Sequence, residues 1–96
     1  MQIAQTIIAQ LGGTGRLSAM INARDFVALE DGVMFRFSGN RKINKIRIRL
    51  NSLDLYDVEF LKVKKYDFTV AASKSNVYAE DLKKIIEQEI KLYLSL

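Results

Sequence analysis

Residues 45–50 read KIRIRL, and this stretch decides the fold. Cations and aliphatic side chains alternate in it at every position, and successive side chains of a β-strand point to opposite faces of the sheet. We therefore expect a half-buried strand whose aliphatic residues face a core and whose cations face outward. A shift of this strand by one residue would bury three charges, so its register is strongly specified.

Short runs of β-branched, aromatic and aliphatic residues flank this strand and are separated by turn residues, which is typical of an antiparallel meander. Asp31-Gly32 predicts a tight hairpin. In the run from residue 56, Leu61 falls on the face opposite Phe60, which indicates either a bulge or a strand covered on both faces. We expect five strands, at residues 17–23, 26–29, 33–37, 45–50 and from 56 to about 63, with a sixth at 68–72 closing the sheet.

Helical periodicity occurs at both ends of the chain. Residues 2–11 place isoleucine and leucine on one stripe, and two glycines follow that can end a helix. Residues 77–94 form a longer amphipathic pattern, with Asn76 as the expected amino-terminal cap. The sequence thus predicts a single α+β domain over residues 1–96. It consists of an amino-terminal helix, an antiparallel meander of five or six strands and a carboxyl-terminal amphipathic helix.

Composition removes several classes of function. The 96 residues include no histidine, cysteine, tryptophan or proline. Disulfides, zinc sites of the Cys/His type and catalysis by Ser-His or Cys-His pairs are therefore excluded. A chain of this length can form one hydrophobic core and has too few residues left to enclose a large cavity. We expect no enzymatic activity, no cofactor and no metal site.

The chain also lacks the signals of export and membrane insertion. No apolar run approaches the roughly 20 residues that a membrane span requires. The amino terminus has neither the basic segment nor the continuous apolar segment of a secretory signal. A cytoplasmic protein without a membrane partner is expected.

Positive charge is concentrated in the middle of the chain. Fifteen basic and eleven acidic residues give a net charge of +4. Six cations occur without an intervening acid: Arg36, Arg41, Lys42, Lys45, Arg47 and Arg49. A positive strand face and the hairpin tip at residues 38–40 would contact phosphates without sequence preference. The alternative is a solvated face whose cations pair with Asp57 and Glu59 and prevent sheet-to-sheet aggregation.

Exposed aromatic rings usually accompany cations in proteins that bind single strands. Phe35, Phe37 and Phe60 alternate with polar residues and are expected to face the core. Tyr56 and Tyr66 remain as the candidates for an exposed platform.

A glycine-rich segment, GGTGR at residues 12–16, superficially suggests a phosphate-binding loop. Such a loop must lead into the amino terminus of a helix, where backbone N–H groups face the anion. Because a strand is expected from residue 17, we interpret the segment as the end of the first helix.

The carboxyl-terminal helix carries more apolar surface than one sheet face can cover, and small domains rarely leave such surface exposed. We expect part of it to contact a partner protein or a second copy of the chain. The expected interface residues are Ile86, Ile90, Leu92, Leu94 and Leu96. Docking of this helix onto the amino-terminal helix of the same domain is the alternative.

Three short motifs recur together in one protein group: QLGG at residues 10–13, DLYDVEF at 54–60 and VYAEDL at 77–82. With them the chain resembles small, uncharacterised proteins encoded by tailed phages and prophages, over nearly its whole length. The third motif departs from the group, which more often has Ala-Asp where this chain has Ala79-Glu80-Asp81. The resemblance implies a mobile-element gene and a bacterial host cytoplasm, and it implies no catalytic or ligand-binding residues.

Two functions follow as hypotheses. The first is a non-enzymatic phage or prophage accessory protein that acts as a protein-interaction module, engaging a host or phage protein or forming a homodimer. The second is a sequence-independent nucleic-acid binder that uses the basic strand and the hairpin tip.

Overall fold

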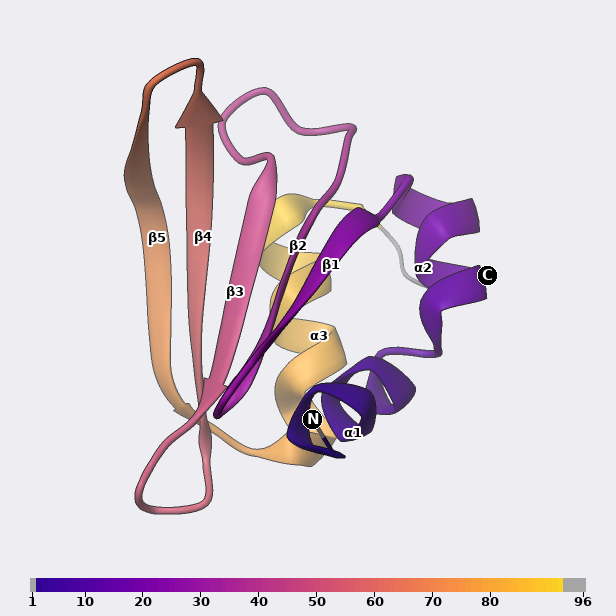
Figure 1. The fold of residues 1–96 in the computed structure, drawn as a ribbon, viewed down its shortest axis with the longest axis vertical. Helices are drawn as coiled ribbons and strands as arrows, with labels where there is room; N and C mark the ends of the chain where they lie inside the picture. The colour runs from indigo at the N-terminus through magenta and orange to yellow at the C-terminus, as the bar shows by residue number, and fades with distance from the viewer. Residues whose placement is uncertain (1, 93–96) are drawn as a thin grey trace.

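The computed structural model describes residues 2–92, which form one sheet with helices on one of its faces (Figure 1). The sheet is an antiparallel meander in the order β1-β2-β3-β4-β5. Its strands are β1 (Arg24–Leu29), β2 (Gly32–Arg36), β3 (Lys45–Leu50), β4 (Tyr56–Lys64) and β5 (Asp67–Val77). The helices are α1 (Gln2–Gln10), α2 (Thr14–Ile21) and α3 (Ala79–Ile90). The predicted α+β class, with a helix at each end and a five-stranded meander between, is confirmed.

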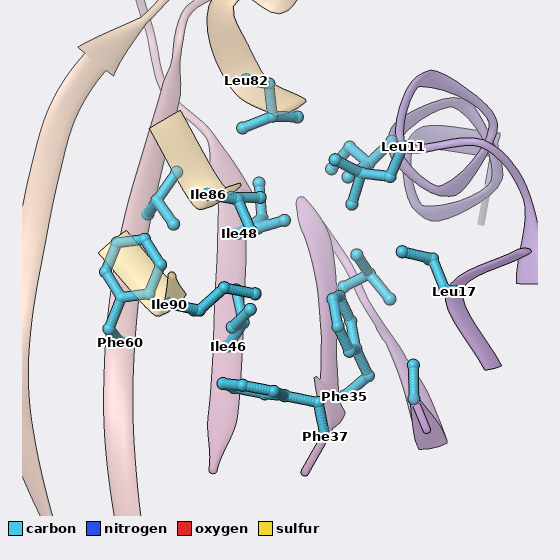
Figure 2. Packing of buried hydrophobic residues seen from close by; sticks show 14 of the residues in the cluster. Leu11, Leu17, Phe35, Phe37, Ile46, Ile48, Phe60, Leu82, Ile86 and Ile90 are labelled. Carbon is cyan, nitrogen blue, oxygen red and sulfur yellow. The ribbon is translucent and has the colours of Figure 1, made fainter. Parts of the chain in front are cut away.

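Strand β3 is the central strand, and its alternation has the predicted effect. Ile46 and Ile48 are completely buried, whereas the three cations of the strand are half-buried or exposed. Figure 2 shows the core that forms between the sheet and the helices. The large, completely buried side chains of this core are Ile7, Leu11, Leu17, Phe35, Phe37, Ile46, Ile48, Phe60, Leu82, Ile86 and Ile90.

The first predicted strand is wrong, because residues 17–23 mostly belong to helix α2. Leu17 and Ile21 lie four residues apart and are both buried, so they form the apolar stripe of a short helix. Asn22 ends the helix in the left-handed conformation, and its N–H donates to the carbonyl of Ser18. The closing strand, predicted at 68–72, is present as the longer β5 and brings the number of strands to five.

The glycine segment joins two helices. Gly12 and Gly13 have φ values of 110° and 91°, which side-chain-bearing residues rarely adopt, so α1 ends there as predicted. The expectation that a strand follows is wrong, since α2 begins at Thr14. The side chain of Arg16 folds back against Gly12.

Helix α3 is shorter than predicted and begins later. Asn76 does not cap it, because Asn76 lies in β5 with a φ of 57° and donates its N–H to Asp57. Tyr78 occupies the cap position instead. At the other end the helix stops at Ile90, whose carbonyl accepts a hydrogen bond of 2.9 Å from the Asn40 side chain.

The predicted interface on this helix is corrected for two of its residues. Ile86 and Ile90 are buried in the domain's own core against the sheet (Figure 2), so a partner cannot reach them. Helix α1 also contacts α3, as the alternative interpretation required. Leu92 is half-buried and packs against Gly39. Leu94 and Leu96 lie outside the described residues.

Candidate nucleic-acid interface

One face of the sheet lies opposite the helices (Figure 1), and we call it the open face. Register and burial place the outward side chains of the central strands on it. Strand register decides which of them become neighbours. Lys45 of β3 lies between Arg36 of β2 and Leu61 of β4. Two residues further along β3, Arg47 lies between Met34 and Glu59. The cations of one strand therefore have different neighbours.

Two cations of β3 are paired with acids. The Arg47 guanidinium donates to Glu59 Oε1 from Nε and Nη2, each at 2.6 Å. Arg49 Nε lies 3.7 Å from Asp31 Oδ1. The predicted pairing of this strand with acids of β4 is thus confirmed for Glu59.

The same prediction is wrong for Asp57. Although Asp57 lies opposite Arg49 in register, its carboxylate accepts hydrogen bonds from the Asn51 side chain at 3.0 Å and from the Asn76 N–H at 3.1 Å. These bonds hold the irregular end of β5 against the turn after β3. Asp57 therefore has a structural role, and Arg49 pairs with Asp31 instead.

Three further cations lie side by side without acids, and we call Arg24, Arg36 and Lys45 the basic row. Register places Arg24 opposite Arg36, and Arg36 opposite Lys45, on three adjacent strands. Within residues 2–92, no carboxylate lies within 4.0 Å of a charged nitrogen of any of the three. Neighbouring strands are about 4.8 Å apart, so three like charges are held close together.

The hydrogen bonds of the row leave its charge uncompensated. Arg24 Nη1 donates to the Asn22 carbonyl at 2.9 Å and to Ser38 Oγ at 3.1 Å, both of which are uncharged. The Nε atom of Arg36 is buried and has no hydrogen-bond partner. A buried donor without a partner is costly, so Arg36 is held at some cost in stability.

A hollow of about 470 Å³ lies beside the basic row on the open face. Lys45 extends from the row into its lining, and the β4–β5 hairpin supplies two cations, one acid and two aromatic rings: Lys64, Lys65, Asp67, Tyr66 and Phe68. Leu61 also lines it and is only 3% exposed, although it faces away from the main core. Strand β4 therefore has apolar residues on both faces, as one of the two predicted alternatives required. The other alternative, a bulge in β4, is not observed, because the extra residue beside Leu61 belongs to β5.

The six predicted cations do not form one surface. Arg41 and Lys42 line a different hollow, on the helix-covered side, together with Ala71, Ala72 and the last residues of α3. The hairpin tip is also not a free finger. The Asn40 side chain accepts hydrogen bonds from the N–H groups of Lys42 and Ile43 and donates to Ile90, so the segment is fastened to α3.

Of the two tyrosines predicted to be exposed, one is exposed and the other is buried. Tyr56 is 6% exposed and belongs to the core, whereas Tyr66 is 90% exposed at the hairpin turn. Phe68, 52% exposed, was not predicted to be part of the site. Its position could have been found by counting outward from the turn, because Val63 and Phe68 pair across it and share a face.

Comparisons with known proteins identify no relative. No family model, no curated protein and no solved structure matches the chain. The resemblance to phage proteins therefore stays a prediction. Among residues 2–92, no group of three or more acidic, histidine or cysteine side chains is placed to hold a metal ion. No helix in this part of the chain is long and apolar enough to cross a membrane.

Proposed function

We propose that this protein is a non-enzymatic nucleic-acid binder that contacts phosphates, without sequence preference, on the open face around the basic row. The observation that carries this proposal is the placement of Arg24, Arg36 and Lys45 in direct register with no acid beside them. Lys64 and Lys65 of the adjacent hairpin add positive charge, and no carboxylate of the described residues lies within 4.0 Å of either ammonium, although Asp67 lies opposite Lys64 in register.

The energetics of the row favour an anionic ligand. Like charges directly opposite each other on neighbouring strands destabilise a sheet, by an amount similar to the roughly 0.2–1 kcal/mol that a good cross-strand pair contributes. Phosphate groups bound against the row would remove this repulsion. Arg and Lys contacts to phosphates fix position but carry no sequence information, so binding without sequence preference is expected.

The competing hypothesis of a protein-interaction module loses its main support. It rested on surplus apolar surface of the carboxyl-terminal helix, and Ile86 and Ile90 are used inside the domain. Within the described residues, no acid compensates the charge of the basic row. A partner protein is accordingly an outcome that the test below can reveal.

The test is the salt dependence of binding, followed by fluorescence anisotropy of a labelled single-stranded oligonucleotide and of a labelled duplex. If four phosphates are contacted, log K should fall against log salt with a slope of about −2.8 on the single strand and about −3.6 on the duplex. Removing two contacts with Arg36→Gln and Lys45→Gln should flatten the single-strand slope by about 1.4.

The matched control removes the same charge elsewhere, with Lys74→Gln and Lys84→Gln. Lys74 lies 3.9 Å from Glu89 of α3, and Lys84 is an exposed residue of that helix. This control should leave the slope nearly unchanged. Absence of binding to both oligonucleotides at about 50 mM salt, where phosphate contacts are least screened, would refute the proposal and leave the protein partner as the better hypothesis.

A further inference from the structure

The hollow beside the basic row combines cations with exposed aromatic rings. We infer that it is a base-stacking subsite, through which the protein prefers single-stranded to duplex nucleic acid. This inference rests on the proposed function and specifies the form of nucleic acid that binds. Its central observation is that Tyr66, Phe68 and Lys45 line one hollow.

Tyr66 is placed as a stacking platform. It lies in the turn between β4 and β5 and is 90% exposed. The Lys65 ammonium lies 5.5 Å from the ring centroid, over one face of the ring. The other face is therefore available to a base, while the ammonium is placed to contact a neighbouring phosphate.

Phe68 supplies a second ring on the open face. It pairs with Val63 across the hairpin and is 52% exposed. Leu61, nearly inaccessible to solvent, lies between this ring and the basic row through its register with Lys45. A base stacked on Phe68 would therefore have its backbone on the side of the basic row. The volume of about 470 Å³ falls within the usual range for small-ligand sites.

Single strands fit this arrangement better than duplexes. The faces of paired bases are covered by their neighbours in the stack, so only unpaired bases can lie flat on a protein ring. Duplex phosphates can still contact the cations. The site should therefore bind both forms electrostatically and gain additional affinity from the single strand alone.

The sheet edges offer a weaker alternative, the addition of a peptide strand. β5 has two register irregularities and Lys74 in its length, and β1 has an irregularity after Arg24. Bulges and edge lysines are features that prevent edge-to-edge pairing. The open face is thus the surface better suited to a ligand.

The experiment compares affinities for a thymidine homopolymer and a mixed-sequence duplex at one salt concentration. Tyr66→Ala and Phe68→Ala should each weaken single-strand binding by about 5- to 100-fold and change duplex binding by less than about twofold. Tyr66→Phe, which keeps the ring, should retain the single-strand affinity. Tyr78→Ala removes an exposed tyrosine outside the hollow and is the matched control.

Tyrosine fluorescence gives a second readout that does not depend on the fold of the alanine variants. The chain has no tryptophan, so its emission comes from four tyrosines. Stacking of a base on Tyr66 should quench part of this emission when the unlabelled homopolymer is added. The quenching should disappear in Tyr66→Phe while the affinity stays the same.

The outcomes separate this inference from the proposed function. Equal affinity for the two forms, with a salt slope present and no effect of Tyr66→Ala, would overturn the stacking subsite and leave phosphate binding intact. Unchanged quenching in Tyr66→Phe would also overturn it. Failure of both oligonucleotides to bind at about 50 mM salt would overturn the two proposals together.

Discussion

The paired cations of β3, Arg47 and Arg49, and the basic row lie on the same open face and differ in what surrounds them. Arg47 faces Glu59 and Arg49 lies beside Asp31, so both charges are compensated within the domain. Lys45, two residues before Arg47, faces Arg36 instead. The same alternating strand therefore contributes both to internal ion pairs and to an uncompensated surface. Register, rather than the charge of the strand, decides which cations are free for an anion.

The first prediction concerns the register that both regions share. A Cβ at Gly32 would lie 1.9 Å from the Ile48 carbonyl oxygen, a backbone atom that cannot move without disturbing the pairing of β2 with β3. Gly32→Ala should therefore cost about 3 kcal/mol or more, or prevent folding. Urea denaturation measures the effect. Gly15→Ala, at a position with no atom within 4 Å, is the control and should be neutral or stabilising. Equal stability of Gly32→Ala and the parent would mean that β2 and β3 are paired differently.

The second prediction compares the two faces of β3. Ile48 is completely buried, so Ile48→Ala should lower the free energy of unfolding by roughly 2–4 kcal/mol. Arg47→Ala removes a partly exposed ion pair and should cost less than about 1 kcal/mol. Urea melts of both variants give the comparison. If Arg47→Ala were the more damaging change, the assigned facing of the strand would be wrong.

The third prediction is that charge changes in the two regions alter the free energy of unfolding in opposite directions. Glu59→Gln leaves Arg47 without its acid and should destabilise the domain by about 0.5–1 kcal/mol. Lys45→Glu places a carboxylate opposite Arg36 and should stabilise it by about 0.2–1 kcal/mol. Both effects should shrink at high salt, since partly exposed charges are screened. Destabilisation by Lys45→Glu would show that the row is not under electrostatic repulsion.

The alternation at 45–50 allowed the central strand, its facing and the Arg47–Glu59 pair to be predicted, because period-two patterns fix which side chains share a face. Helix α2 was missed because Leu17 and Ile21 also fit a strand of alternating apolar residues. The interface on α3 was misplaced for a different reason. How much apolar surface a helix buries depends on its neighbours, and α1 is far from α3 in sequence.

The candidate site was harder to predict than the fold. Arg24 belongs to the basic row because β1 pairs with β2, and this pairing has an irregularity directly after Arg24 that the sequence does not reveal. Phe68 enters the hollow through the turn that pairs it with Val63. Local sequence patterns contain neither of these cross-strand relations. From the sequence alone, Arg41 and Lys42 are therefore grouped with the strand cations, although they lie on the helix-covered side of the sheet.

The most direct test of the account compares two double variants that remove equal charge from the same face, Arg36→Gln with Lys45→Gln and Arg47→Gln with Arg49→Gln. The quantity measured is the slope of log K against log salt for a labelled single-stranded oligonucleotide. We predict that the first pair flattens the slope by about 1.4 and the second by less than half as much, because Arg47 and Arg49 are already neutralised by Glu59 and Asp31. An equal or larger change from the second pair would contradict the account.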